Sequence, residues 1–142
     1  MGNTFYAKTE GADQAGTYRI TDAAASTVET FATTYWTKAT ENVTACYPAT
    51  GVVNLANQSS SLAYVLKATA RNVSCNNSVS LDFKYQLAKV RVVFTGANAS
   101  KVTNVQIEGY TSCTNNKGEV KDPTDIGEIN MKETTLSDGT IC

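Results

Sequence analysis

Apolar and polar residues alternate along much of this chain. The clearest run covers residues 79–87, in which every odd-numbered residue is apolar. Successive side chains of a strand point to opposite faces of a sheet, so a period of two predicts a strand with one buried face. After Leu87 the apolar face moves to even-numbered positions, from Ala88 to Phe94. This change of parity predicts a bulge, or the passage of the strand from one sheet to another.

Several other segments are rich in β-branched and aromatic residues, which favour strands. They are residues 4–8, 17–20, 28–36, 42–47, 62–70, 101–108 and 126–132. Segments rich in Gly, Pro, Asn and Ser lie between them and predict turns, for example at 47–51 and 115–118. Apart from one possible helical turn at 23–25, no apolar stripe has helical spacing. The sequence therefore predicts an all-β fold, an antiparallel β-sandwich of about seven or more strands.

Length and charge narrow the classes of protein that remain. The chain has 142 residues, 42% of them hydrophobic and 18% charged, which suits a single domain spanning residues 1–142. Its formal net charge is −1 and no Lys/Arg cluster occurs, so we expect no nucleic-acid partner. No apolar run approaches the length of about 18 residues that a spanning helix needs, so we expect no direct membrane span.

The four cysteines are widely spaced and form no CxxC motif. Two disulfides in an oxidising compartment are favoured over free buried thiols, and both are favoured over a metal site, which would need all four thiolates. Each antiparallel strand carries the chain to the opposite end of a sandwich, and counting these crossings favours one of three connectivities. The candidate disulfides are Cys75–Cys113 and Cys46–Cys142.

The residues offer little catalytic chemistry. The chain contains no His, which removes the commonest general base and the usual partner of Ser or Cys nucleophiles. No GxSxG, SxxK, GxGxxG or Walker motif occurs, so we predict no enzyme, no catalytic residues and no cofactor. The carboxylates of Asp122, Asp125 and Glu128 are interpreted as an acidic turn in preference to a calcium site. Tyr35 and Trp36 could form a platform for a sugar, although core or rim positions are favoured.

One long stretch resembles a known family. Residues 81–92 read LDFKYQLAKVRV, which is similar to the signature of the fimbrillin-like proteins of Bacteroidetes, the subunits of type V pili. The following run, VTNVQIEGY at 102–110, resembles that family's next strand. Upstream, Tyr35-Trp36 and the run VTACYP at 43–48 resemble its tryptophan strand and its aromatic-proline turn. The resemblance covers about residues 28–130 and corresponds to the amino-terminal domain of such a subunit.

The resemblance implies a transthyretin-like Greek-key sandwich and a structural, adhesive subunit that is exported to the cell surface and polymerises by strand donation. The implied partners are other pilus subunits, and a surface ligand of a host or bacterium is a further candidate. The implied site is a strand-packing core, formed by Trp36, Leu81, Phe83, Leu87, Ala88, Val90, Val92, Val105 and Ile107. The alternative function is a ligand- or glycan-binding module at the cell surface on the same sandwich.

Overall fold

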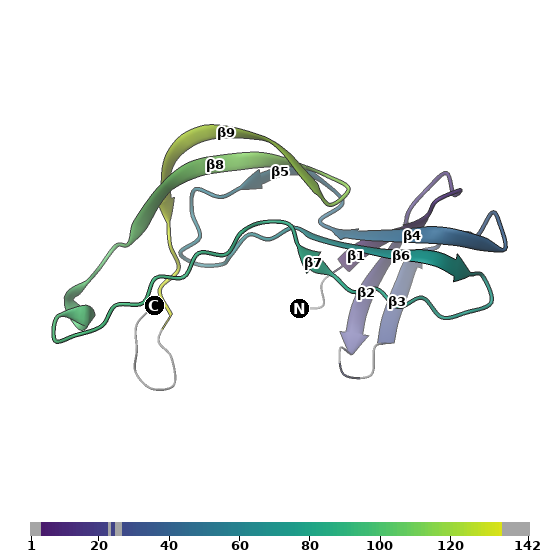
Figure 1. The fold of residues 1–142 in the computed structure, drawn as a ribbon, viewed down its shortest axis with the longest axis horizontal. Coiled ribbons are helices and arrows are strands. Elements are labelled where there is room, and N and C mark those ends of the chain that lie inside the picture. The colour runs from purple at the N-terminus through teal and green to yellow at the C-terminus, as the bar shows by residue number, and fades with distance from the viewer. Residues whose placement is uncertain (1–3, 23, 25–26, 135–142) are drawn as a thin grey trace. The chain divides into compact units, whose positions relative to one another are not determined.

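The computed structural model describes residues 4–22, 24 and 27–134. Two antiparallel sheets account for its strands. The first has six strands in the order β3-β2-β1-β4-β6-β7, and the second has three in the order β5-β8-β9 (Figure 1). The expected fold class, an all-β antiparallel β-sandwich, is confirmed. The single helical element among the described residues is a 3-10 turn, η1, at Ala99–Lys101.

The strands of the six-stranded sheet agree best with the sequence pattern. Their bounds are β1 Thr4–Thr9, β2 Gly16–Asp22, β3 Thr27–Ala32, β4 Thr40–Tyr47, β6 Leu66–Ser74 and β7 Lys84–Tyr85. Along β1 the odd-numbered residues are buried and the even-numbered ones half-buried, as period-two alternation requires. The three remaining strands are β5 Thr50–Asn54, β8 Gln106–Asn116 and β9 Glu119–Asn130.

The chain divides into two compact units. The first comprises Met1–Gly51, Val65–Gln86 and Asn115–Val120, and the second comprises Val52–Tyr64, Leu87–Thr114 and Lys121–Cys142. The chain therefore leaves the first unit after Gln86 and enters the second at Leu87, where the apolar parity changes in the sequence. The expectation of a single domain over 1–142 stays a prediction.

The core of the first unit is built on small residues. Ala7, Ala45 and Ala68 face one another across the neighbouring strands β1, β4 and β6, and all three are buried. Their small side chains leave room for the ring of Phe5, which stacks on Tyr18 and meets Phe83 edge-on, each at 5.5 Å between ring centroids. Such aromatic pairs contribute about 0.5–1.5 kcal/mol beyond their buried area.

The β8–β9 hairpin ends in a tight turn that packs within the first unit. Lys117 and Gly118 both have positive φ, 52° and 80°, as a two-residue hairpin turn requires. The buried Asn115 amide donates to the Pro48 carbonyl at 2.8 Å, and its oxygen accepts from the Gly118 N–H at 2.9 Å. Lys67 forms an ion pair with Glu119 at 2.9 Å. The turn expected at 115–118 is thereby confirmed.

The strand expected over 79–94 is largely wrong. Only Lys84 and Tyr85 form a ladder there, pairing as β7 with β6. The strand expected at 101–108 begins only at Gln106, and the first two residues of β5, Thr50 and Gly51, were expected to belong to a turn. The possible helical turn at 23–25 includes residues outside the described part of the chain. A high β-propensity cannot by itself make a strand, because a strand also needs a neighbour that takes up its backbone hydrogen bonds.

Candidate functional site

An open groove lies in the second unit. Its volume is about 450 Å³. Its apolar lining comes from three separate segments, and asparagines are three of its six polar lining residues. The lining residues are Asn57, Ser59, Val92, Phe94, Val102, Asn104, Val105, Asn130, Met131, Lys132 and Glu133. We call this the unit-2 groove. Five of these eleven residues are apolar and six are polar, and peptide- and ligand-binding sites likewise combine apolar side chains with polar groups.

One wall of the unit-2 groove carries an unpaired length of backbone. Residues 87–95 form no helix or strand, and none of their backbone groups is hydrogen-bonded to another described residue. The segment reads LAKVRVVFT, which is rich in the β-branched and aromatic residues that favour strands. Val92 and Phe94 from this segment are half-buried and line the groove. We call residues 87–95 the unpaired segment.

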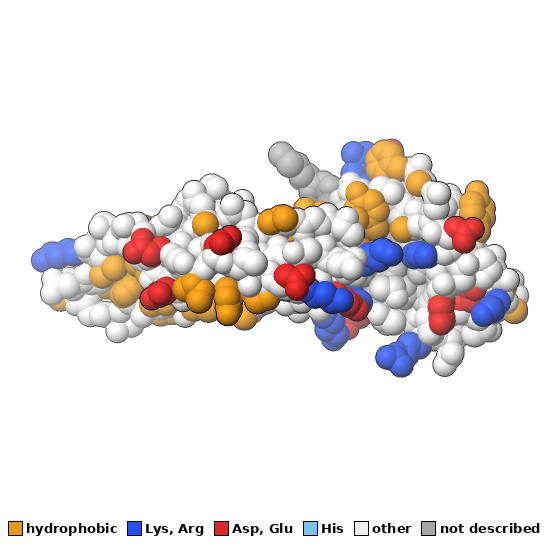
Figure 2. Space-filling view, turned by 90° about the horizontal axis from the view of Figure 1, so that it is seen from above, with side chains coloured by type: hydrophobic (Ala, Val, Ile, Leu, Met, Phe, Trp, Pro, Cys, Tyr) orange, Lys and Arg blue, Asp and Glu red, His pale blue; other side chains and the backbone are white. Residues whose placement is uncertain are grey.

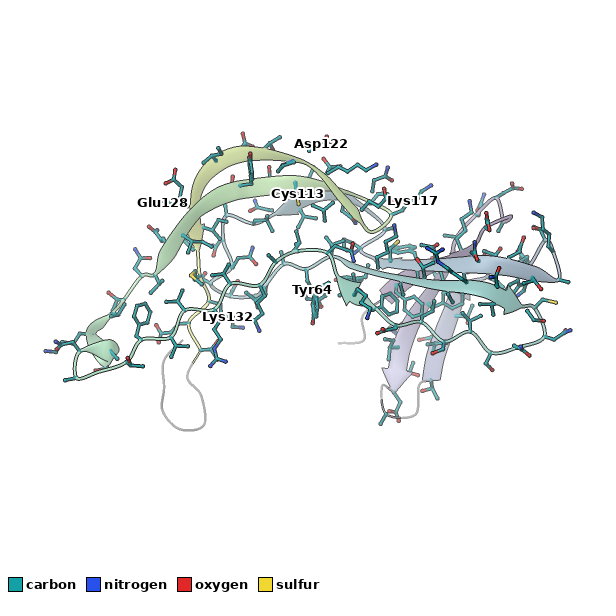
Figure 3. All side chains as sticks on the ribbon, viewed as in Figure 1. Tyr64, Cys113, Lys117, Asp122, Glu128 and Lys132 are labelled. Atoms are coloured by element: carbon teal, nitrogen blue, oxygen red, sulfur yellow. The ribbon has the colours of Figure 1, made fainter. Side chains whose placement is uncertain are left out.

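The opposite parts of the groove are fixed by hydrogen bonds. The Asn130 N–H donates to Ala56 and its carbonyl accepts from Gln58, both at 2.8 Å. The Met131 N–H donates to the Val105 carbonyl at 3.2 Å. Lys132, on the segment that follows β9, donates to the Ser60 carbonyl at 3.1 Å (Figure 3). The groove is therefore firmly tied on these sides, in contrast to the unpaired segment.

The sheet edges differ in how well they are protected against pairing. β9 is an edge strand, and it contains Pro123 and the exposed acids Asp122 and Glu128, which are labelled in Figure 3. Proline and charged side chains are common means of blunting an edge. The edge strand β3 is exposed throughout, and Arg19 covers its Phe31 ring at 5.2 Å from the centroid. The unpaired segment contains no proline, and its charged residues are the exposed Lys89 and Arg91.

The residues of the expected strand-packing core have different environments. Leu81 and Phe83 pack against the core of the first unit, and Val92 and Val105 line the unit-2 groove. Trp36, Leu87 and Ile107 are half-buried. Ala88 and Val90, which lie in the unpaired segment, are exposed, Val90 at 53%. The strand-packing core that the resemblance implies stays a prediction. Phe94, Val102 and Met131 also line the groove, and no motif in the sequence marks them as site residues.

Large apolar side chains reach the surface in separate patches (Figure 2). Val90 and Val93 of the unpaired segment are 53% and 46% exposed. Tyr35, part of the possible sugar platform, is 73% exposed, whereas its neighbour Trp36 is half-buried. The exposed valines therefore belong to the same segment whose backbone is unpaired.

The three described cysteines are free thiols. Cys46 and Cys113 are buried and Cys75 is exposed. Burial raises the pKa of both buried thiols, and for Cys46 the charges of Lys67 and Lys117 oppose that rise. The Cys75–Cys113 disulfide is not formed in this structure and stays a prediction. The Cys46–Cys142 disulfide involves a residue outside the described part of the chain.

A buried carboxylate organises the loop before β4. Glu41 is only 5% exposed, and it accepts hydrogen bonds from the hydroxyl and the N–H of Thr37, the latter at 3.2 Å. The hydroxyl bond from Thr37 holds the pKa of Glu41 below its ordinary value, against the effect of burial. Thr9 donates to the Tyr35 carbonyl at 2.8 Å. This cluster fixes the loop that carries Trp36, the only tryptophan of the chain.

The acidic turn around Asp122 does not gather into a metal-binding group. Within the described ranges, no three His, Cys, Asp or Glu side chains are placed to hold a metal ion. Asp125 instead accepts a hydrogen bond from Ser112 at 3.4 Å, and its backbone carbonyl accepts from Thr111 at 2.6 Å. The three carboxylates lie on β9, and the bonds of Asp125 link β9 to its neighbour β8.

Comparisons of the chain with family models, with curated proteins and with solved structures give no match. Among the residues that the structure describes, no helix is both long enough and apolar enough to cross a membrane. The unpaired segment offers backbone groups for pairing, and the unit-2 groove beside it offers apolar and polar side chains for contact.

Proposed function

We propose that this chain is a structural and adhesive subunit of a cell-surface fimbria, and that it assembles with other subunits by strand donation. The resemblance of residues 28–130 to the fimbrillin-like subunits motivates the proposal. The single observation that carries it is the unpaired segment, a β-prone run of nine residues whose backbone groups form no hydrogen bond with another described residue and which lies beside a partly apolar groove.

The physical argument begins with the backbone. A strand with unpaired N–H and C=O groups is a template on which another chain can add a strand. In this mode of recognition the backbone hydrogen bonds supply affinity, and pockets for alternate side chains supply specificity. The unpaired segment provides the backbone groups, and Val92 and Phe94 provide apolar side chains that line the groove.

The form of the groove also favours a strand over a compact ligand. Val92 and Phe94 place apolar side chains at alternate positions of one wall, and Val102 and Val105 add apolar side chains from a second segment, in which Asn104 has a φ of 55°. An extended peptide places every second side chain on one face, so it can fill successive apolar positions of such a groove. A subunit that donates one strand and accepts another forms head-to-tail contacts, and contacts of this kind continue into a fibre when they do not close into a ring.

The test uses two substitutions at Val93. Val93→Pro removes an unpaired N–H without removing any hydrogen bond within the described chain. Val93→Thr is the matched control, because it keeps the β-branched shape and the N–H. Sedimentation velocity and electron microscopy of the chain at increasing concentration measure assembly. We expect concentration-dependent polymers from the natural chain and Val93→Thr, and little assembly from Val93→Pro. Absence of assembly in the natural chain, or equal assembly by Val93→Pro, contradicts the proposal.

A further inference from the structure

The unpaired segment lies in a stretch with a one-sided charge. Residues 83–107 contain four basic residues and no Asp or Glu, whereas the whole chain has 12 basic and 13 acidic residues. Lys84 is already paired with Asp82 at 2.8 Å. The other three basic residues, Lys89, Arg91 and Lys101, form no ion pair with a described residue. Positive charge without a partner is therefore concentrated at and beside the unpaired segment.

The alternation of the segment separates this charge from its apolar residues. In extended backbone successive side chains point to opposite sides, so Lys89 and Arg91 share one side, and Val90 and Val92 share the other. Both basic residues are exposed. An added strand would thus meet apolar side chains on the groove side and two cations on the other side.

Charges on the remaining rim of the unit-2 groove do not cancel this bias. The lining contains one residue of each sign, Lys132 and Glu133. Lys132 donates to the Ser60 carbonyl. The net electrostatic preference is therefore set by Lys89 and Arg91. Opposite charges facing each other across two strands are favourable, and like charges are unfavourable.

We infer that the unpaired segment selects a strand of a neighbouring subunit that carries carboxylates at alternate positions, opposite Lys89 and Arg91. This inference rests on the proposed strand donation and adds the chemistry of the partner to it. Charge complementarity of this kind rejects unsuitable strands and speeds the encounter of suitable ones. Assembly would then be strongest between the basic acceptor segment and an acidic donor strand.

Three fluorescent nine-residue peptides test the inference by anisotropy with the natural chain. All three carry Val at the odd positions, with Glu, Lys or Ser at the even positions. We expect the Glu peptide to bind at least tenfold more tightly than the Lys peptide at low ionic strength. The difference should shrink in 0.5 M NaCl, because salt at about 1 M shortens the screening length to about 3 Å, compared with 10 Å at 0.1 M.

Charge reversal supplies the second arm. The double variant Lys89→Glu with Arg91→Glu should prefer the Lys peptide. The control double variant Arg71→Glu with Lys117→Glu changes the net charge equally at exposed positions of the first unit and should keep the preference for Glu. Equal binding of all three peptides overturns this inference but leaves strand donation standing. Binding of none of them contradicts strand donation itself. A reversed preference in the control variant also overturns the inference.

Discussion

Gly118, at the tip of the β8–β9 hairpin, lies directly against Cys46 of β4. A Cβ atom placed on Gly118 would stand 3.0 Å from the Cβ of Cys46 and 3.0 Å from that of Lys67. The φ of Gly118 is +80°, a conformation that glycine adopts readily and other residues do not. Both the backbone and the close approach therefore require glycine at this turn.

Replacement of Gly118 by Ala should destabilise the chain by about 2–4 kcal/mol, since it adds a left-handed backbone penalty and a steric clash. Gly96→Ala is the control: its φ is also positive, at 99°, but a Cβ there meets nothing within 4 Å. We expect the control to lose only about 1–2 kcal/mol. Urea denaturation gives both values, and equal losses in the two variants would show that the contact with Cys46 is unimportant.

Two residues of the family-like signature should respond very differently to truncation. Phe83 packs against Phe5 at 5.5 Å, so Phe83→Ala should cost about 2–3 kcal/mol of unfolding free energy. Val90 is 53% exposed, so Val90→Ala should change the stability by no more than about 0.5 kcal/mol. Chemical denaturation of the monomer provides the comparison. A large loss in Val90→Ala would mean that the unpaired segment is packed on both faces.

Acid should release the loop that contains Trp36. The pKa of Glu41 is lowered in the folded chain by hydrogen bonds from Thr37, so Glu41 adds stability above its unfolded pKa, about 4.3 for a free Glu. That stability is lost as the pH falls through the lower, folded-state pKa. The fluorescence of Trp36 should follow this acid transition. In Glu41→Gln the transition attributable to this carboxyl should vanish, and an unchanged acid titration would refute its role.

The thiols of the reduced chain should react at unequal rates. Cys75 is exposed, whereas burial raises the pKa of Cys46 and Cys113 and so lowers their thiolate fraction. Among these three thiols, iodoacetamide should therefore modify Cys75 first, and Cys46 and Cys113 only slowly until denaturant is added. Mass spectrometry of timed digests measures the order. Modification of Cys46 as fast as Cys75 would be incompatible with the packing of the hairpin tip over it.

The sequence predicts best those strands whose two faces differ clearly in burial. Alternation at Phe5 and Ala7 locates β1, and the turn residues at 115–118 locate the hairpin tip correctly. The change of parity at Leu87 marks the point where the chain passes between the two units. These features are local, so the order of residues is sufficient to reveal them.

Other features depend on neighbours that a single sequence does not identify. The run from Leu87 to Thr95 has the composition of a strand, but composition reports the ability to pair and not the presence of a partner. The groove lining was likewise difficult to foresee, because Phe94, Val102 and Met131 come from separate segments. Pro48 and Gly51 predict a turn at 47–51, yet the backbone from residue 50 onward joins the three-stranded sheet as β5.

Hydrogen exchange of residues 87–95 tests the central claim most directly. In the monomer, the amides of this segment should exchange rapidly, because none of them is hydrogen-bonded to a described backbone group. In the assembled form the same amides should become strongly protected, while those of β1 and β4 change little. Mass spectrometry of peptides from both forms measures the difference. Polymers in which residues 87–95 still exchange as rapidly as in the monomer would contradict assembly through this segment.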